Sequence, residues 1–396
     1  LYSSMVQYTI DLHNADNIVI ENNDIQWGSH NVTIWDDSDN GIIRNNRIHE
    51  STGSGIYFLT GGAGFDWNAQ SNDGWLVQNN EIYNISPKCE WCGVTSGDTG
   101  DRHSIGVQGG GNNHIWEFNN IHDSGGDGVG FYNWTRLASG NAQRNNIIRY
   151  NYIHDIKDLH PMCQHSAPGE FDEPDPGFPV KCQLSYGIFY GADSSPADPD
   201  TITGNIVHHN VLARVRGIAL RTKTTEAASG FTWRFLNNTV IDSGIGFDFS
   251  VFNPTVAPFR RGGAEFRNNI IYNSTTQHLR AYLLQSVADA DTSAFGMSNN
   301  IYYPDGPGMF KFGHHPNNTV SSDFASWDDN SRIVDSGSLT SDPLFVDPTT
   351  AGAFAWAGTP LVIPGGGNFQ LTTVPTVSPA FNSGAAYDLT PAPDSD

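Results

Sequence analysis

The sequence predicts an all-β protein, a right-handed parallel β-helix of about nine or more coils, on three observations. A short motif of Asn, any residue and an aliphatic residue recurs along the chain, as in Asn46 with Ile48 and Asn80 with Ile82. A second segment, which alternates apolar and polar residues, follows most copies of this motif. The composition, with 42 Gly, 21 Pro and 16% charged residues, is rich in turns and poor in helix.

The Asn motif has irregular spacing but a fixed local form. Its Asn residues are Asn23, Asn46, Asn80, Asn119, Asn151, Asn210, Asn238, Asn269 and Asn299. This combination predicts coils of constant cross-section whose connecting loops differ in length. We expect the Asn side chains to form a ladder inside a turn, in which each amide bonds the equivalent amide one coil away.

The second segment has the two-residue period of a β-strand and is enriched in β-branched and aromatic residues. Its central apolar residues are Ile56, Ile105, Val129, Ile188, Ile218 and Ile245. Each coil is therefore expected to contain at least two short strands that pair in parallel with those of its neighbours. Aligning the copies on the central residue predicts which side chains face outward.

Charge and hydropathy exclude several classes of function. The chain has 20 Lys and Arg against 42 Asp and Glu, a net charge of −22 that opposes nucleic acid as a partner. No apolar run is long enough to span a membrane. The repeat is already present at Asn17, so we expect that an amino-terminal part with the export signal and end cap precedes Leu1. An open first coil would allow end-to-end self-association.

The predicted organisation is one repeat domain with a short tail. Residues 1–340 form the β-helix, residues 341–389 its closing coil, and residues 390–396 a tail rich in Pro and Asp. Four cysteines, all in long loops, predict two disulfides formed in an oxidising compartment. A four-cysteine zinc site and a redox C-x-x-C remain open alternatives. The cysteines are Cys89, Cys92, Cys163 and Cys182.

These motifs, over nearly the whole chain, resemble those of the parallel β-helix repeat superfamily of secreted carbohydrate-active proteins. Pectate lyases, polygalacturonases, alginate lyases, mannuronan epimerases and several glycoside hydrolase families share this repeat. The resemblance implies a secreted or cell-surface protein that acts on a polysaccharide. The signature motifs of the polygalacturonases, pectate lyases and mannuronan epimerases are absent, so no individual family is assigned.

The candidate catalytic residues form one outward column, His103, Asp127, Tyr186 and Arg216, on consecutive coils. This set suits β-elimination or epimerisation at C5 of a uronic acid. Arg216 or Arg221 would neutralise the sugar carboxylate, Tyr186 or His103 would remove or return the proton, and Asp127 would orient His103 or tune its pKa. The candidate substrate-binding residues are Gln108, Tyr132, Trp134, Asp193, Arg221 and Lys223. A solvated polar ladder would explain the same column, and a register displaced by one residue would move every one of these side chains to the opposite face.

Two other functions remain open. A glycoside hydrolase would pair Asp127 with a loop carboxylate from Asp101, Asp123, Asp155 or Asp158. A non-catalytic adhesin or filament subunit would use only the stacked coils. The repeated His–Asp at His122–Asp123 and His154–Asp155 predicts a metal or acid site, or simply stacked turn residues. The sequence identifies no cofactor, and the acidic run 170–175 could bind Ca²⁺ or form a solvated loop.

Overall fold

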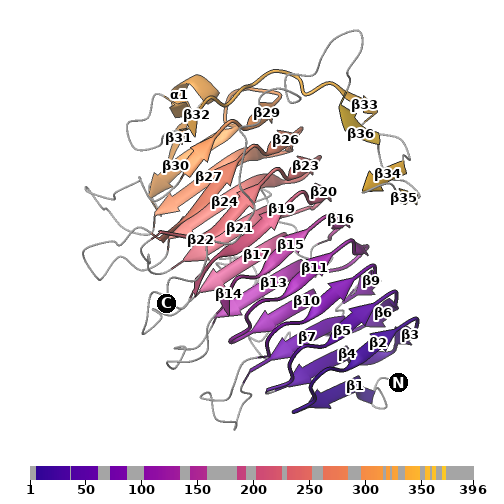
Figure 1. The fold of residues 1–396 in the computed structure, drawn as a ribbon. Helices are drawn as coiled ribbons and strands as arrows, with labels where there is room; N and C mark the ends of the chain where they lie inside the picture. Colours follow the sequence, from indigo (N-terminus) through magenta and orange to yellow (C-terminus); the bar gives the residue numbers. More distant parts are fainter. Residues whose placement is uncertain are drawn as a thin grey trace, which may run out of the picture.

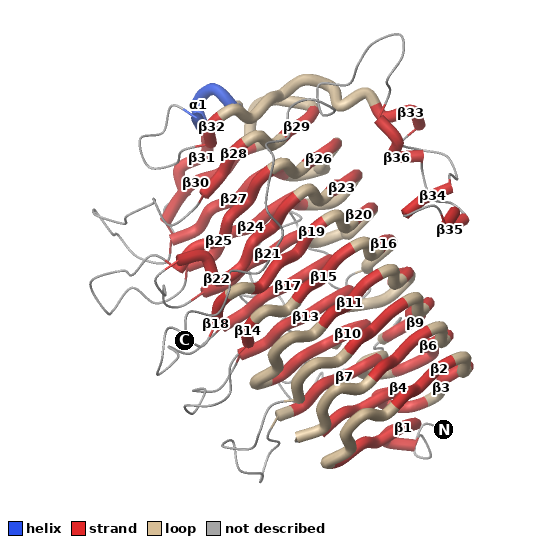
Figure 2. The backbone as a smooth tube through the Cα atoms, in the orientation of Figure 1, coloured by secondary structure: helices blue, strands red, loops and turns tan. Residues whose placement is uncertain are grey.

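The computed structural model describes residues 6–35, 37–60, 72–86, 102–133, 143–157, 185–192, 202–224, 230–251, 262–283, 296–314, 318–321, 323–328, 335–347, 353–356, 359–362 and 368–371. Parallel strands stack into three long sheets around one core, as Figures 1 and 2 show. The fold is a right-handed parallel β-helix, which confirms the predicted class. Within the described residues, the nine strands of the third sheet mark nine coils.

The strands of the three sheets follow one another in the order second, third, first within each coil. The first sheet contains β1 (Val6–His13), β4 (Gly28–Trp35), β7 (Ile56–Leu59), β10 (His103–Gln108), β13 (Asp127–Asn133), β17 (Tyr186–Ala192), β21 (Ile218–Thr224), β24 (Ile245–Val251), β27 (Gln277–Leu283), β30 (Phe310–His314) and β31 (Asn318–Ser321). The second contains β2 (Val19–Glu21), β5 (Ile42–Arg44), β8 (Leu76–Gln78), β11 (Ile115–Glu117), β15 (Ile147–Arg149), β19 (Asn205–His208), β22 (Gly230–Leu236), β25 (Gly262–Arg267), β28 (Gly296–Ser298) and β32 (Asp335–Ser336). The third contains β3 (Asp24–Gln26), β6 (Arg47–Ser51), β9 (Glu81–Ile85), β12 (Asn120–His122), β16 (Tyr152–His154), β20 (Val211–Ala213), β23 (Thr239–Ile241), β26 (Ile270–Tyr272) and β29 (Ile301–Tyr303).

The corner between the second and third sheets explains why the motif so often begins with two Asn residues. The first residue of the pair adopts positive φ, as Asn45 does at 56° and Asn79 at 54°. A non-glycine residue in this region costs about 1–2 kcal/mol, and Asn tolerates it better than most residues. The strand that sequence analysis did not resolve, in the second sheet, ends immediately before this corner, as β5 does before Asn45.

The second Asn of each pair forms the predicted ladder, which the structure confirms. The Oδ1 atom of Asn119 accepts hydrogen bonds from the backbone nitrogen and Nδ2 of Asn80, both at 3.0 Å. Its Nδ2 donates to Val77 O at 2.9 Å and to Asn151 Oδ1 at 3.0 Å. The same bonds recur from Asn46 to the end of the ladder, and they satisfy polar groups that are otherwise buried.

The last rung of the ladder corrects the sequence prediction. Asn269 bonds Asn300 through its backbone nitrogen at 2.9 Å, and Asn299 instead occupies the positive-φ corner position. The inward residue of this coil is consequently Tyr302, which pairs with Ile271. The predicted copy of Asn299 with Ile301 was therefore wrong by one residue, because Tyr302 in the aliphatic position concealed the correct alignment.

Removing one rung is expected to destabilise the protein by about 3 kcal/mol, because Asn119→Ala leaves at least two buried backbone groups without partners. The measurement is the free energy of unfolding in urea. The matched control is Asn120→Ala, since this neighbouring side chain is only half-buried and accepts one bond, from His154 Nε2 at 3.1 Å. Equal destabilisation by the two substitutions would contradict a special contribution of the ladder.

Aliphatic and aromatic side chains of all three sheets fill the interior. The inward column of the third sheet is mostly Ile, as in Ile48, Ile82 and Ile121, each with 0% exposure. The second sheet contributes larger residues, such as Trp116 and Phe235, which are fully buried too. Burial of each such side chain contributes about 1.5–3 kcal/mol. The repeat thus stabilises each coil against its two neighbours.

Several buried histidines make folding sensitive to acid. Burial is the largest cause that lowers the pKa of His30, His114 and His278 to about 4 each. An unfolded His binds its proton near pH 6.5, so the unfolded state takes up protons first as the pH falls. The contribution of these histidines to the free energy of unfolding is therefore fully present above about pH 6.5, and it is lost as the pH falls toward 4.

Thermal melts at about pH 7.5, where the unfolded histidines are neutral, and at about pH 5, where they are protonated, test this effect. For His114 alone the expected loss of stability at the lower pH is about 2 kcal/mol. The variant His114→Gln should lose less stability between the two conditions than the unmodified chain. A melting temperature that stays constant or rises toward pH 5 would contradict the role of these histidines.

The parallel stack ends near Leu339, which bridges to Ile301 after β32. The helix α1 (Phe324–Asp328) contacts β30 and β31 near this end, whereas the pair β14 (Gln143–Arg144) and β18 (Ile202–Thr203) lies beside the middle coils (Figure 1). Beyond it the described residues form two antiparallel pairs, β33 (Phe345–Asp347) with β36 (Asn368–Leu371), and β34 (Ala353–Trp356) with β35 (Thr359–Val362). Figure 1 shows these pairs beside the end of the stack. The ring centres of Phe345 and of Tyr272 in the third sheet lie 5.4 Å apart. A closing coil and the tail at 390–396 stay predictions.

Within the described residues, no helix is long and apolar enough to cross a membrane. At the amino-terminal end, β1, β2 and β3 form the edges of the three sheets. Self-association through this end stays a prediction.

Candidate active site

A bend at the start of the first-sheet strands from β10 to β27 determines which side chains face outward. In β13, Val129 is in the core, and a Cβ added to Gly128 would lie 2.7 Å from the core residue Ile153. Two successive residues therefore face inward. Asp127 before them, and Gly130 and Tyr132 after them, belong to the outer face, while Phe131 lies in the core.

On this outer face, His103 and Asp127 form a buried hydrogen-bonded dyad. They are direct partners of neighbouring strands, and His103 Nδ1 lies 3.0 Å from Asp127 Oδ2. The Tyr132 hydroxyl donates to the same carboxylate oxygen. The imidazole lies across Gly130, where an added Cβ would meet His103 Nδ1 at 2.8 Å, so glycine is needed there. His103 and Asp127 have 0% exposure.

The second nitrogen of the His103 ring is the unusual atom of this site. His103 Nε2 is buried and has no hydrogen-bond partner among the described residues. Leaving a buried polar atom without a partner costs about 1–3 kcal/mol. The Ser54 hydroxyl, one strand away in the same column, is likewise buried without a partner. This part of the outer face is therefore suited to a polar ligand.

A second polar group lies further along the same sheet. Arg221 Nη1 donates to the Tyr186 hydroxyl, and its guanidinium carbon lies 4.9 Å from the centre of the Tyr186 ring. Asp248 lies between two arginines, with Oδ2 at 3.3 Å from Arg221 Nε and 2.8 Å from Arg280 Nη2. All four side chains are at most 2% exposed. Buried charges of this kind require such pairing.

Aromatic rings connect the two polar groups into one layer. Ring centres lie 4.6 Å apart between His103 and Tyr132, 4.8 Å between Tyr132 and Phe189, and 4.7 Å between Phe189 and Tyr186. The Arg221 guanidinium carbon also lies 5.6 Å from the centre of the Phe189 ring. The site is therefore continuous from His103 to Arg221.

The structure brings together three of the four predicted catalytic residues and excludes Arg216. The column runs from His103 to Asp127 to Tyr186, but the next partner is Ile218. Arg216 precedes β21, is exposed, and donates its backbone nitrogen to Ile156 O at 3.0 Å.

The misplacement of Arg216 has a local cause. The Gly217–Ile218 pair imitates Gly187–Ile188, but Ala219 occupies the inward position equivalent to Gly187, whose added Cβ would meet Ala219 O at 2.5 Å. The strands are consequently displaced by two residues relative to the prediction. A shift of two residues preserves the face of the sheet. Arg221 therefore stays outward and takes the position next to Tyr186.

The other predicted substrate-binding residues are divided. Tyr132 and Arg221 belong to the site, while Gln108 Oε1 accepts a hydrogen bond from the Tyr57 hydroxyl on the adjacent strand. Lys223 lies in β21 and pairs with Gly191. Outside the described residues lie Trp134, Asp193 and the cysteines Cys89, Cys92, Cys163 and Cys182.

Sequence analysis missed Arg280 and Phe189. Arg280 follows Asp248 by 32 residues, an interval close to that of the Asn motif, and this spacing was a usable signal. Its strand β27 lacks the Gly–Ile pair by which the other strands were aligned. Phe189 directly follows the inward Ile188, at a position that the predicted outward columns did not include.

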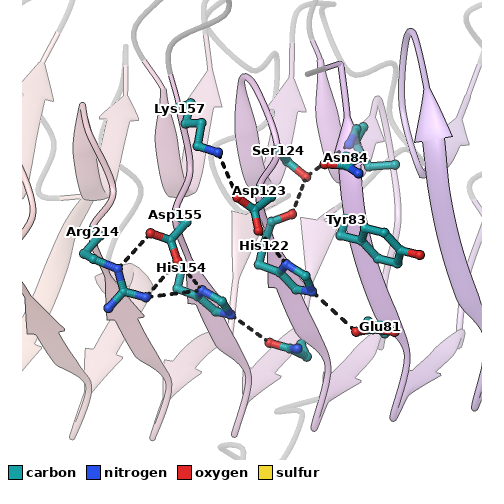
Figure 3. Close-up of polar contacts among 12 residues, drawn as sticks. Glu81, Tyr83, Asn84, His122, Asp123, Ser124, His154, Asp155, Lys157 and Arg214 are labelled. Atoms are coloured by element: carbon teal, nitrogen blue, oxygen red, sulfur yellow. Dashed lines mark hydrogen bonds and ion pairs between the residues drawn. The ribbon is translucent and has the colours of Figure 1, made fainter. Parts of the chain in front are cut away.

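The repeated His–Asp motif forms a separate cluster at the third sheet, which Figure 3 shows. His122 and His154 are stacked, with ring centres 5.0 Å apart, and each Nδ1 bonds the adjacent carboxylate, at 3.0 Å for Asp123 and 2.7 Å for Asp155. Arg214 donates twice to Asp155, both at 2.7 Å. This cluster is paired internally and stabilises the turn toward the first sheet.

The cluster accounts for two of the carboxylates expected to partner Asp127. Lys157 Nζ lies 2.8 Å from Asp123 Oδ1, and the bonds from Lys157 and His122 outweigh desolvation and lower the pKa of Asp123. The pKa of Asp155 is lowered in the same way: desolvation opposes the shift, but the bonds from Arg214 and His154 exceed it. Both residues are ion-paired at the third sheet. Asp101 and Asp158 lie outside the described residues.

Within the described part of the chain, no group of three or more His, Cys, Asp or Glu side chains is arranged to hold a metal ion. The acidic run 170–175, which could bind Ca²⁺, lies outside it. Ca²⁺ binding there stays a prediction.

The stacked sheets and the buried layer define the chain as a parallel β-helix protein with a candidate active site on the outer face of its first sheet. No family model and no curated protein matches the sequence. It is similar in structure to the catalytic domain of Agl-KA, at 13% identity and a TM-score of 0.41, covering 72% of this chain and 47% of that one. It is also similar to the catalytic unit of the thermostable GH87 alpha-1,3-glucanase from Streptomyces thermodiastaticus strain HF3-3, at 13% identity and a TM-score of 0.44, covering 83% and 48%. The chain thus spans about half the length of each.

Proposed function

We propose that the protein is a polysaccharide-active enzyme that removes the C5 proton of a uronic acid. As a lyase it would then break the bond from C4 to the glycosidic oxygen and protonate that oxygen, and as an epimerase it would return a proton to C5 from the opposite face. The observation that supports this most directly is the enclosed His103, paired with Asp127 through Nδ1 and without a described partner at Nε2. The polymeric substrate implies an extracellular location.

The dyad has the arrangement of a general base. An ionised carboxylate only accepts hydrogen bonds, so His103 Nδ1 carries the proton in its bond to Asp127. In the neutral ring, Nε2 then presents a lone pair. Asp127 also stabilises the imidazolium that forms when Nε2 takes a proton. Tyr132 holds Asp127 in place through its hydroxyl.

Tyr186 supplies a second proton-transfer group. Arg221 donates to its phenol oxygen, and this stabilises negative charge on that oxygen. Tyr186 and His103 are separated by one intervening strand, β13, so their backbones are about 10 Å apart. One group can remove the C5 proton while the other donates a proton, to the leaving glycosidic oxygen in an elimination or to the opposite face of C5 in an epimerisation.

The cations of the site suit an acidic sugar. Arg221, Asp248, Arg280 and Lys311 are successive partners on four strands, three cationic side chains and one carboxylate in a chain of net charge −22. Positive charge near a uronate carboxylate lowers the free energy of the carbanion at C5. Because the site is buried, these interactions are stronger than in water. Arg221, Asp248 and Arg280 are at most 2% exposed, so the residues that cover them must move when a substrate binds.

The described residues favour this chemistry over glycoside hydrolysis. A hydrolase needs two carboxyl groups about 5–10 Å apart. Asp127 and Asp248 are separated by three strand steps and by three positions along the strand, which places their backbones about 17 Å apart. Asp248 is in addition held between two arginines.

The proposal is tested with alginate, pectate and glycosaminoglycans in D₂O. A lyase produces the ultraviolet absorbance of an unsaturated uronate, and an epimerase incorporates deuterium at C5 without cleavage. Neither signal with any of these polymers, together with new reducing ends from a neutral glycan, would overturn the proposal in favour of a hydrolase. Failure to turn over any glycan would favour a non-catalytic adhesin or filament subunit.

A further inference from the structure

A row of aromatic rings at the corner between the second and third sheets has no part in the site described above. Six coils place Asn at this positive-φ corner, but three consecutive coils place Phe118, Tyr150 and His209 there, at φ of 56°, 56° and 53°. Bulky residues are uncommon in this region, because their side chains make it costly. Residues held in such conformations are concentrated at functional sites.

The three rings lie in one row along the axis of the β-helix. Phe118 and Tyr150 are stacked, with ring centres 5.2 Å apart and 15° between planes, and the centres of Tyr150 and His209 lie 5.4 Å apart with the planes tilted by 39°. All three side chains are partly exposed. The row is therefore accessible to a ligand that extends over several coils.

Polar groups flank the rings. The Arg149 guanidinium carbon lies 5.7 Å from the centre of the Tyr150 ring, and Arg149 Nη2 lies 2.6 Å from Glu117 Oε2. Next to His209, the His208 Nδ1 atom lies 2.8 Å from His209 Nδ1. Apolar ring edges beside donors and acceptors match the alternation of C–H groups and hydroxyls on a sugar chain.

The row of rings lies on a different side of the β-helix from the His103 site. Each coil passes from the second sheet to the third and then to the first, so this corner is the one that does not border the first sheet (Figure 1). A ligand at the corner consequently leaves the buried layer unoccupied.

We propose that Phe118, Tyr150 and His209 form a secondary binding site for a polysaccharide chain, lying along the β-helix axis. This inference rests on the proposed function for the class of ligand. The site would hold the polymer while the first sheet acts on another part of it, and thus increase the local concentration of substrate.

The test compares the unmodified chain with the triple variant Phe118→Asn, Tyr150→Asn and His209→Asn, which restores the residue found in the other coils. Affinity electrophoresis in gels that contain each polymer measures binding. We expect at least tenfold weaker binding, an unchanged or higher melting temperature, and unchanged turnover of short oligosaccharides. The control is Tyr83→Asn, which removes a stacked ring from the third-sheet face. Unaltered binding of every polymer by the triple variant would overturn the proposal.

A second measurement avoids dependence on the folding of the variant. Hydroxyl-radical footprinting of the unmodified chain should show that the polymer protects Phe118, Tyr150 and His209 from oxidation. Absence of protection would overturn the proposal, as would an oligomer of the chain that the triple substitution dissociates. Binding is measured without turnover, so failure of the proposed chemistry leaves this result interpretable.

Discussion

Turnover of the uronate polymer is expected to fall by about 10²–10⁴-fold when His103 is replaced by Ala, because the variant lacks the general base. The loss should appear in kcat, since the ring acts on the proton rather than on the rest of the sugar chain. Added imidazole should restore part of the activity, because the substitution leaves a ring-sized space between Gly106 and Gly130. Initial rates of product formation measure both effects.

His122→Ala is the matched control for this experiment. His122 has the same bond from Nδ1 to an aspartate, at 3.0 Å, but belongs to the third sheet. Its replacement should leave turnover unchanged. If His103→Ala retains most of the activity while folding normally, the proposed site is wrong.

Replacing Tyr186 by Phe is expected to reduce turnover by about 10²–10³-fold, because only the hydroxyl that exchanges the proton is removed. The ring, and with it the stacking on Phe189 at 4.7 Å, is retained, so the fold should not change. Arg221→Lys should act in the same direction, since lysine does not reproduce the fork of donors that reaches both Tyr186 and Asp248.

The pH profile separates a chemical role from a structural one. Loss of the Tyr186 hydroxyl should remove one limb of the profile of kcat, whereas a packing defect would lower activity equally at every pH. Tyr83→Phe, on the third sheet, is the control and should have a profile like that of the unmodified chain. An unchanged profile in Tyr186→Phe would exclude this residue as a proton donor or acceptor.

Much of the fold was predictable because the repeat is local. An Asn that bonds its equivalent one coil away must recur in every coil, so the ladder from Asn46 to Asn269 could be recognised from sequence alone. The end of the ladder could not be recognised in this way, since Tyr302 occupies the position that is aliphatic in the other coils. The second-sheet strands have only three residues in most coils, too few to establish a period.

The site was only partly predictable from the sequence. The register between neighbouring strands is set by contacts that a single sequence does not show. Nothing in the sequence distinguishes Gly217 from Gly187, although only the latter lies at the inward bend. The consequence was the choice of Arg216 in place of Arg221. Burial of the polar layer was also unexpected, because outward positions of a sheet are ordinarily solvated.

The Asn ladder makes the chain modular. Asn46 and Asn80 make the same bonds to the next rung, so the ladder between Asn46 and Asn119 would close equally well if the coil that contains Asn80 were excised. Such a deletion would move two halves of the outer face one step closer together. New combinations of functional side chains could thus arise by gain or loss of whole coils, without any redesign of the interior.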